Sequence, residues 1–276
     1  MKRGAAVVLA SFLFLTPALA CEKHRAAAAV EKAPYTLKAL SPEVLTPGEQ
    51  ATLRVALGNT DGTPVVADSL VVAHTEKFHL LLISADFKEY HHIHPQPVAG
   101  TPGVYEAPFT PNQTAFRLWA DITPPGGQAY VPGTMGTLEK KPAIDLKPTG
   151  RANSGQISAL IETPTFNAGE DAVVRIALRD ADGKPLAGAE PYLGALGHLV
   201  GFSVDGKRIL HAHPVDETYP ASGVLSFHVN APQSGIWKLF LQVQQNGAVH
   251  TLPFTVAVAR SSVKPVKAKG DQHDHH

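Results

Sequence analysis

Hydrophobic and polar residues alternate along most of the chain in short runs, with few segments at the 3.6-residue spacing of a helix. In residues 52–57 the odd positions are apolar, as in a strand that is buried on one face. Gly, Pro and Asp interrupt these runs at roughly 8–12-residue spacing, which is typical of sandwiches. We expect strands over 35–40, 51–57, 65–72, 78–84, 89–94, 104–109, 116–122 and 129–138, and over 157–161, 172–178, 192–195, 198–204, 207–213, 224–229, 235–243 and 248–258.

The two halves of the chain repeat each other. Residues 48–65 parallel residues 169–186, and residues 116–119 parallel residues 237–240. Each unit holds about 105 residues of short strands, a pattern typical of immunoglobulin-like domains. The sequence therefore predicts an all-β fold of two tandem immunoglobulin-like antiparallel β-sandwich domains.

The most specific part of the repeat is a histidine, twelve further residues, and then His-x-His-Pro, at 79–95 and again at 198–214. In the second copy, Asp205-Gly206 predicts a hairpin with a two-residue turn. That register sets His198 opposite His213, with His211 two residues away on the same face. Opposed residues have Cβ atoms about 4.5–5.5 Å apart, so three imidazoles converge on one side of the hairpin.

The first copy has the same spacing but a weaker turn, because Phe87 stands where positive φ is needed. We expect a four-residue loop over 85–88 that keeps the register. His79 then lies opposite His94 and beside His92, while His91 points to the other face.

Three neutral imidazoles on one face suit Zn²⁺ or Cu²⁺. The predicted metal ligands are His79, His92, His94, His198, His211 and His213. Met135 and a single cysteine are too few for a Cu⁺ site, so copper as Cu²⁺ is favoured and zinc comes next. A single histidine on a strand is more often structural, so the hydrogen-bonding role stays open. Further candidate ligands are His74, Asp121, His250, His273, His275 and His276. We assign no catalytic residue.

The N-terminal sequence suggests that the protein is exported. Residues 1–20 have the charged start, apolar core and small-residue cleavage site of a signal peptide. Cys21 follows at once, as in a bacterial lipobox, and would be the lipidated residue; a plain cleavage site before a cysteine is the other interpretation. We expect a periplasmic protein or an outer-membrane-anchored lipoprotein that contacts the membrane only through a lipid anchor. The predicted divisions are a tether at 21–33, domains at 34–140 and 155–259, a linker at 141–154 and a disordered tail at 260–276.

The balance of charged residues bears on which partners the protein can bind. The chain has 24 basic and 24 acidic residues, which argues against nucleic acid. Its layout resembles periplasmic immunoglobulin-like modules of copper handling, the YtkA-like and CopC-like families, through the segments 78–95 and 198–214 and the last strand at 247–256. That resemblance implies periplasmic metal handling. CopC-like proteins begin with a histidine ligand and this chain would begin at Cys21, so that binding mode is not transferred.

Three functions compete. The first is an exported protein that binds a transition metal for sequestration or transfer, with a metal-delivering or metal-receiving protein as its partner. The second is a tandem adhesion or scaffold module with structural histidines. The third is a metal-dependent enzyme with a three-histidine site. No Ser-His-Asp pattern, P-loop or dinucleotide fingerprint is present.

Overall fold

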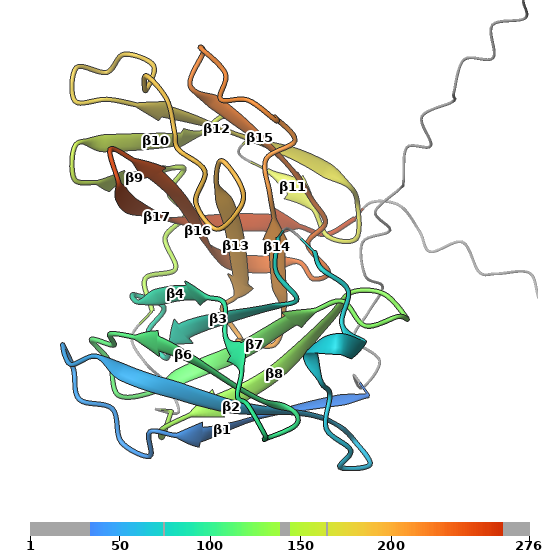
Figure 1. The fold of residues 1–276 in the computed structure, drawn as a ribbon. Helices are drawn as coiled ribbons and strands as arrows, with labels where there is room; N and C mark the ends of the chain where they lie inside the picture. The colour runs from blue at the N-terminus through green and yellow to red at the C-terminus, as the bar shows by residue number, and fades with distance from the viewer. Residues whose placement is uncertain (1–33, 74, 139–143, 164, 262–276) are drawn as a thin grey trace, which may run out of the picture.

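The chain folds into four stacked β-sheets (Figure 1), described by a computed structural model over residues 34–73, 75–138, 144–163 and 165–261. The outer sheet of the first domain has the order β1 (Tyr35–Ser41), β2 (Ala51–Asn59), β6 (Val104–Phe109) and β5 (Gln96–Pro97). Its inner sheet has the order β4 (Tyr90–Ile93), β3 (Phe78–Ser84), β7 (Phe116–Ile122) and β8 (Ala129–Met135).

The second domain repeats this arrangement. Its inner sheet has the order β11 (Phe166–Asn167), β17 (Ala248–Ala259), β16 (Gly235–Gln245), β13 (His198–Ser203) and β14 (Ile209–Ala212). Its outer sheet has the order β15 (Val224–Val229), β12 (Ala172–Arg179), β10 (Ile157–Ile161) and β9 (Arg151–Ser154). All named strand pairs are antiparallel except β11 with β17. The predicted pair of immunoglobulin-like sandwiches is confirmed.

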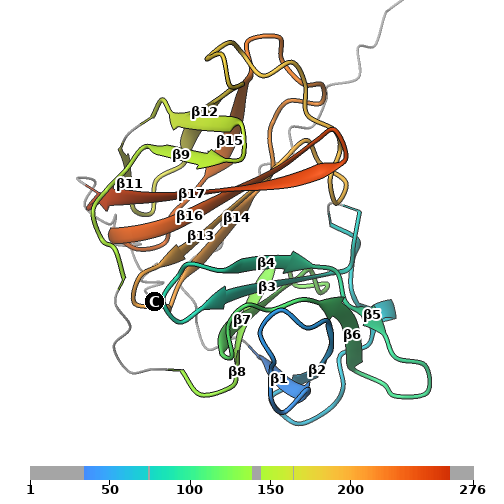
Figure 2. The ribbon, with the colours of Figure 1, turned by 90° about the vertical axis from the view of Figure 1, so that its left-hand side faces the viewer.

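The two inner sheets face each other, as Figure 2 shows for β3 and β4 against β13 and β14. Alternate residues of β3 point into the core of the first domain, which includes Leu80 and Leu82. The residues between them, Leu81 and Ile83, point outward and pack against Val200 and other residues of the second domain in a separate apolar cluster. All seven residues of β3 and all six of β13 are therefore buried. A strand buried on both faces reads as a continuous apolar run, as residues 80–83 of β3 do.

The two tryptophans are both buried, in different apolar clusters. Trp237 lies in the core of the second domain, where its indole N–H donates to the Gln233 carbonyl at 2.9 Å. Trp119 lies in the cluster between the domains, together with Phe240, its counterpart in the repeat.

Both hairpins turn through four-residue loops, 85–88 and 204–207. In the second copy, Ser203 N–H donates to Arg208 O at 3.0 Å and Gly206 N–H donates to Ser203 O at 2.7 Å. The expected two-residue turn is therefore wrong, although the register is the predicted one. Phe87 adopts the positive φ that it was expected to resist, 59° against 70° for Gly206. Its ring is buried between the domains, and this packing offsets the strain.

Two expected strands are absent from the described structure. Residues 67–69 form the short 3₁₀ helix η1 (Ala67–Ser69), where the Ser69 hydroxyl bonds to Val66 O at 2.7 Å, a local bond that competes with strand pairing. Residues 192–195 make only an isolated bridge between Tyr192 and Ala195, because Leu193 and Gly194 have positive φ and reverse the chain. Conversely, β5, β9 and β11 were not predicted, and β9 falls within the segment predicted as linker. No helix of the described residues is long and apolar enough to cross a membrane.

Candidate metal centre

Each hairpin gathers its three histidines on the face that looks toward the other domain. The register of the pairings Leu80–Ile93 and Leu199–Ala212, continued by one residue, sets His79 opposite His94 and His198 opposite His213. The ring centroids of these pairs lie 4.5 and 4.6 Å apart. The register that the sequence predicted is thus the one observed. His91 faces the first domain's own core, where it contacts Phe109 and Phe116, and so lies apart from these histidines.

The two sets of histidines meet in one cluster across the domain interface, which we call the six-histidine cluster: His79, His92, His94, His198, His211 and His213. The ring of His92 lies 4.7 Å from that of His198 and 5.0 Å from that of His211, measured between centroids. Sequence reasoning treated the hairpins as separate sites. It missed their convergence because nothing in the local pattern fixes how two domains dock.

Burial keeps four of these imidazoles neutral. His79, His92 and His198 are 2%, 3% and 0% exposed. Desolvation lowers the pKa of His92 well below its usual value, and the neighbouring imidazoles lower it further. Desolvation also lowers the pKa of His79, that of His94 to about 4 and that of His198 to about 3. At neutral pH these rings therefore carry a lone pair and no charge.

Fixed acceptors outside the cluster set the tautomers of three rings. His79 Nε2–H donates to Ala73 O at 2.9 Å, and His198 Nε2–H donates to Tyr192 O at 2.7 Å. These carbonyls occupy equivalent places in the repeat. His211 Nδ1–H donates to the Asp121 carboxylate at 2.7 Å, a contact between the two domains. The other nitrogen of each ring then carries the lone pair, as in metal sites whose histidines are oriented by outer partners.

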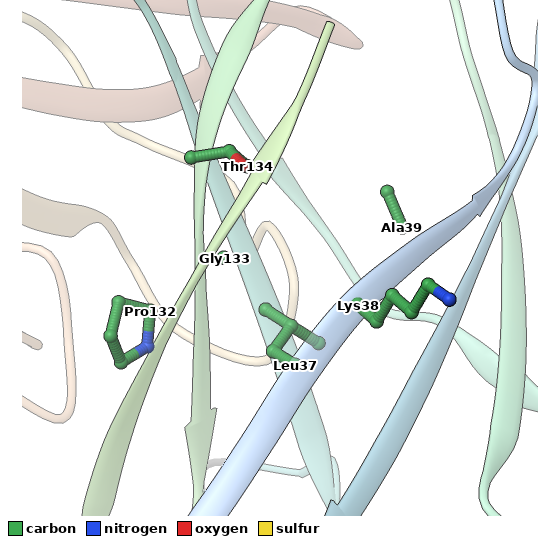
Figure 3. Close-up of a pocket in the computed structure, with 6 residues that line it drawn as sticks. All are labelled: Leu37, Lys38, Ala39, Pro132, Gly133 and Thr134. Atoms are coloured by element: carbon green, nitrogen blue, oxygen red, sulfur yellow. The ribbon is translucent and has the colours of Figure 1, made fainter. Parts of the chain in front are cut away.

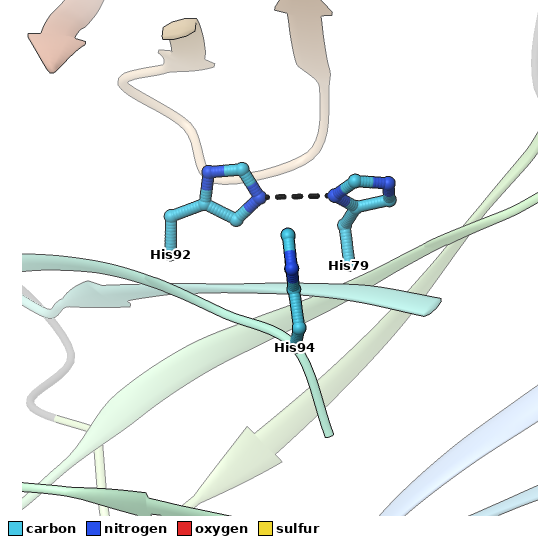
Figure 4. A group of neighbouring side chains, drawn as sticks. All are labelled: His79, His92 and His94. Atoms are coloured by element: carbon cyan, nitrogen blue, oxygen red, sulfur yellow. Dashed lines mark hydrogen bonds between the residues drawn. The ribbon is translucent and has the colours of Figure 1, made fainter. Parts of the chain in front are cut away.

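Several ring nitrogens face the interior with no hydrogen bond among the described residues: His92 Nδ1, His94 Nε2, His198 Nδ1 and His211 Nε2. His79 Nδ1 is the exception, since it lies 3.1 Å from His92 Nε2. Figure 4 shows this contact, with the ring of His94 rising between the two. With His79 Nδ1 as the acceptor, His92 Nε2 carries the hydrogen.

Two groups of three histidines have ligand atoms that all lie within 4.8 Å of one another. One is His79, His92 and His94; the other is His92, His198 and His211. His92 belongs to both groups. The first group is formed by one hairpin, as predicted, whereas the second takes residues from both domains.

The further candidate ligands fall in different places. Asp121 is 4% exposed and orients His211. His250 lies away from the cluster, with its Nδ1 3.2 Å from Ser154 O. His74, His273, His275, His276 and the predicted lipidation residue Cys21 lie outside the described residues. Sequence reasoning did not single out Gln242, which is buried and pairs with His198 across β16 and β13. Its alignment with Asp121 in the repeat was the available signal.

A shallow pocket elsewhere offers little chemistry. It lies between β1 and β8 and is lined by Leu37, Lys38, Ala39, Pro132, Gly133 and Thr134 (Figure 3). Lys38 brings its only ionisable group. The six-histidine cluster is thus the stronger candidate.

One protein-family profile matches the chain twice, over residues 28–138 and 154–260; its description is "Domain of unknown function (DUF8832)". No curated protein matches the sequence. Solved structures with similar folds include the Escherichia coli adhesin FdeC, with 14% identity over 82% of this chain and 64% of that one, at a TM-score of 0.28. Yersinia pseudotuberculosis InvD shares 16% over 87% and 61%, also at 0.28.

Invasin, a bacterial integrin-binding protein, shares 13% identity over 83% of this chain and 40% of that one, at a TM-score of 0.28. This chain spans less than two thirds of the length of these three. At these TM-scores the matches carry no argument about function.

Proposed function

The chain belongs to the family described as "Domain of unknown function (DUF8832)", with two copies of the domain, and we propose that it binds one transition-metal ion in the six-histidine cluster between them. The observation that carries the proposal is the orientation of His79, His198 and His211. Each ring gives its outer hydrogen to a fixed acceptor and turns its lone pair toward the shared interior.

Energetics favours an occupied cluster. A buried polar atom without a partner costs about 1–3 kcal/mol, and His94 Nε2, His198 Nδ1 and His211 Nε2 are three such atoms. An ion held by His94 would satisfy one of these lone pairs, which no described hydrogen-bond donor reaches.

The first group is the better cradle for the ion. In a tetrahedral site with Zn–N bonds of about 2.0–2.1 Å, two ligand nitrogens lie about 3.3 Å apart. His79 Nδ1 and His92 Nε2 are 3.1 Å apart, already close to that spacing. His94 Nε2 supplies a third ligand and a fourth position stays open. His198 and His211 then line the far side.

One ion per chain follows from the shared residue. A neutral imidazole has a single lone pair on its ring nitrogens, so His92 serves only one of the two groups at a time. All-nitrogen ligation favours Cu²⁺ and then Zn²⁺. Met135 does not supply a thioether ligand, because its side chain is buried in the core of the first domain.

We place the metal-binding protein outside the cytoplasm, in the periplasm or lipid-anchored at Cys21, where it sequesters or passes on the ion. This part rests on the sequence of residues 1–21. Mass spectrometry of the mature N-terminus tests it: a lipid-modified Cys21 supports the anchor, and an unmodified one supports the soluble form.

Elemental analysis of protein purified without an affinity tag tests the binding. We expect one copper or zinc ion per chain, loss of the ion in His92→Ala, and weaker binding in His94→Ala. The matched control is His228→Ala on β15, because His228 is exposed on the outer sheet. Full metal content in His92→Ala, or none in the wild type, would instead favour the scaffold alternative with structural histidines.

A further inference from the structure

Gln242 is a buried side chain that the metal site described above does not yet use. It pairs with His198 across β16 and β13, and Asp121 pairs with His79 across β7 and β3 in the same way. The two residues are 5% and 4% exposed. They are therefore equivalent positions of the two inner sheets, one beside each leading histidine of the repeat.

Asp121 already shows what this position can do. Its Oδ1 accepts from Gln128 Nε2 at 2.9 Å, and its Oδ2 crosses the interface to accept from His211 Nδ1 at 2.7 Å. A carboxylate of the first domain thereby fixes the tautomer of a histidine in the second.

The equivalent contact in the other direction would join His92 of the first domain to Gln242 of the second. The two atoms that would form it, His92 Nδ1 and Gln242 Oε1, are both buried and have no hydrogen-bond partner among the described residues. Gln242 Nε2 donates to Thr251 Oγ1 at 3.2 Å, which leaves Gln242 Oε1 as the free end of the amide. His92, the counterpart of His211, has an unpartnered Nδ1. His92 also packs against His198, which pairs with Gln242.

We propose that Gln242 is the positioning residue for His92 in the metal-bound protein, an inference that rests on the proposed metal site. Without metal, His92 carries its hydrogen on Nε2 and donates it to His79 Nδ1. When the ion binds, the lone pair of His92 Nε2 becomes a ligand, the ring's single proton moves to Nδ1, and Nδ1–H donates to Gln242 Oε1. The ring is neutral before and after, so this step releases no proton.

Each domain then orients the central histidine of the other, through Asp121 for His211 and through Gln242 for His92. The consequence is that a full-affinity site exists only while the inner sheets are docked. The ion in turn stabilises the docked arrangement, because ligand binding to one state favours that state.

NMR spectroscopy of the mature full-length protein tests the proton shift. Long-range ¹H–¹⁵N spectra of ¹⁵N-histidine-labelled protein report which ring nitrogen carries hydrogen. We expect the Nε2–H tautomer of His92 without metal and the Nδ1–H tautomer after loading with Zn²⁺, which is diamagnetic. His92→Ala assigns the signals. A His92 ring that keeps its hydrogen on Nε2 in the loaded protein overturns the inference.

Affinity for Zn²⁺ gives a second, independent readout. Loss of an outer partner of a metal ligand typically costs about 10–100-fold in affinity, and we expect this of Gln242→Leu, which keeps the volume and removes the acceptor. Gln242→Glu restores an acceptor like that of Asp121 and should bind within a few-fold of the wild type. Wild-type affinity in Gln242→Leu contradicts the inference while leaving the metal site intact; absence of Zn²⁺ binding in the wild type removes both.

Discussion

The two hairpins have the same backbone register and loop length but differ in the side chains around them. Their registers and four-residue loops agree, although Phe87 in one stands where Gly206 stands in the other. The outer partners differ more, with Asp121 in the first domain and Gln242 in the second. Duplication has thus kept the histidines and the strands that carry them, while the two copies differ at a turn residue and in groups around the rings.

The largest effect should come from acid, which acts on both hairpins alike. Folding lowers the pKa of His198 to about 3 and that of His94 to about 4, so the unfolded chain binds more protons below pH 6.5. Stability is fully present above pH 6.5 and is lost as pH falls from there toward 4. Down to pH 4, His198 alone accounts for a loss on the order of 3 kcal/mol.

Urea unfolding of metal-free protein from pH 8 to pH 4 measures this loss. Because His198 is the more strongly shifted, His198→Gln should flatten the pH dependence more than His94→Gln. A denaturation midpoint that is constant across this range would show that the histidines are not buried as the structure has them.

The next largest effect should come from the turn residue of the first hairpin. Phe87→Gly relieves a positive-φ strain of about 1–2 kcal/mol but removes a buried ring, which costs about 3–5 kcal/mol. The net result should be a loss of about 2–3 kcal/mol in the free energy of unfolding, measured by urea titration. Val249→Ala, at a surface position that is 42% exposed, is the control and should change stability by less than about 0.5 kcal/mol. A stabilised Phe87→Gly variant would mean that strain outweighs packing at this turn.

Asp121 should come next. Asp121→Ala leaves the Nδ1–H of His211 buried without an acceptor, which costs about 1–3 kcal/mol of stability. Asp121→Asn keeps a carbonyl acceptor at the same place, as Gln242 does in the second domain, and should recover most of the loss. Equal losses in Ala and Asn would show that the charge, rather than the hydrogen bond, matters at this position.

The sequence predicted the hairpins well because their information is local. Alternation and the Asp205-Gly206 signal fixed the register that joins His198 to His213, whatever the loop length. The interface was not predictable in this way, since it depends on which sheet faces meet. One signal was present: the run of apolar residues at 80–83 lacks polar positions, and such a run indicates a strand buried on both faces.

Gln242 shows the other limit of sequence reasoning. A glutamine in a strand such as β16 has no chemical signature that marks it as part of a metal site. Its proposed role is suggested by the carboxylate of Asp121 at the equivalent position of the other domain. Alignment of the repeats can pair Gln242 with Asp121, but only the docked sheets reveal that Asp121 reaches His211 across the interface.

The smallest effect should come from Glu76, a third difference between the copies. Its carboxylate lies 3.9 Å from His94 Nδ1, with a side chain that is 37% exposed, and the repeat has Ala195 in its place. A long, partly solvated contact of this kind contributes about 0–1 kcal/mol. Glu76→Ala should therefore change the unfolding free energy by less than about 0.5 kcal/mol and the metal affinity by a few-fold at most, measured by urea and Zn²⁺ titration. A tenfold loss of affinity would instead indicate that Glu76 is a ligand at the open fourth position. The two hairpins would then differ in a metal ligand as well as in the residues around the rings.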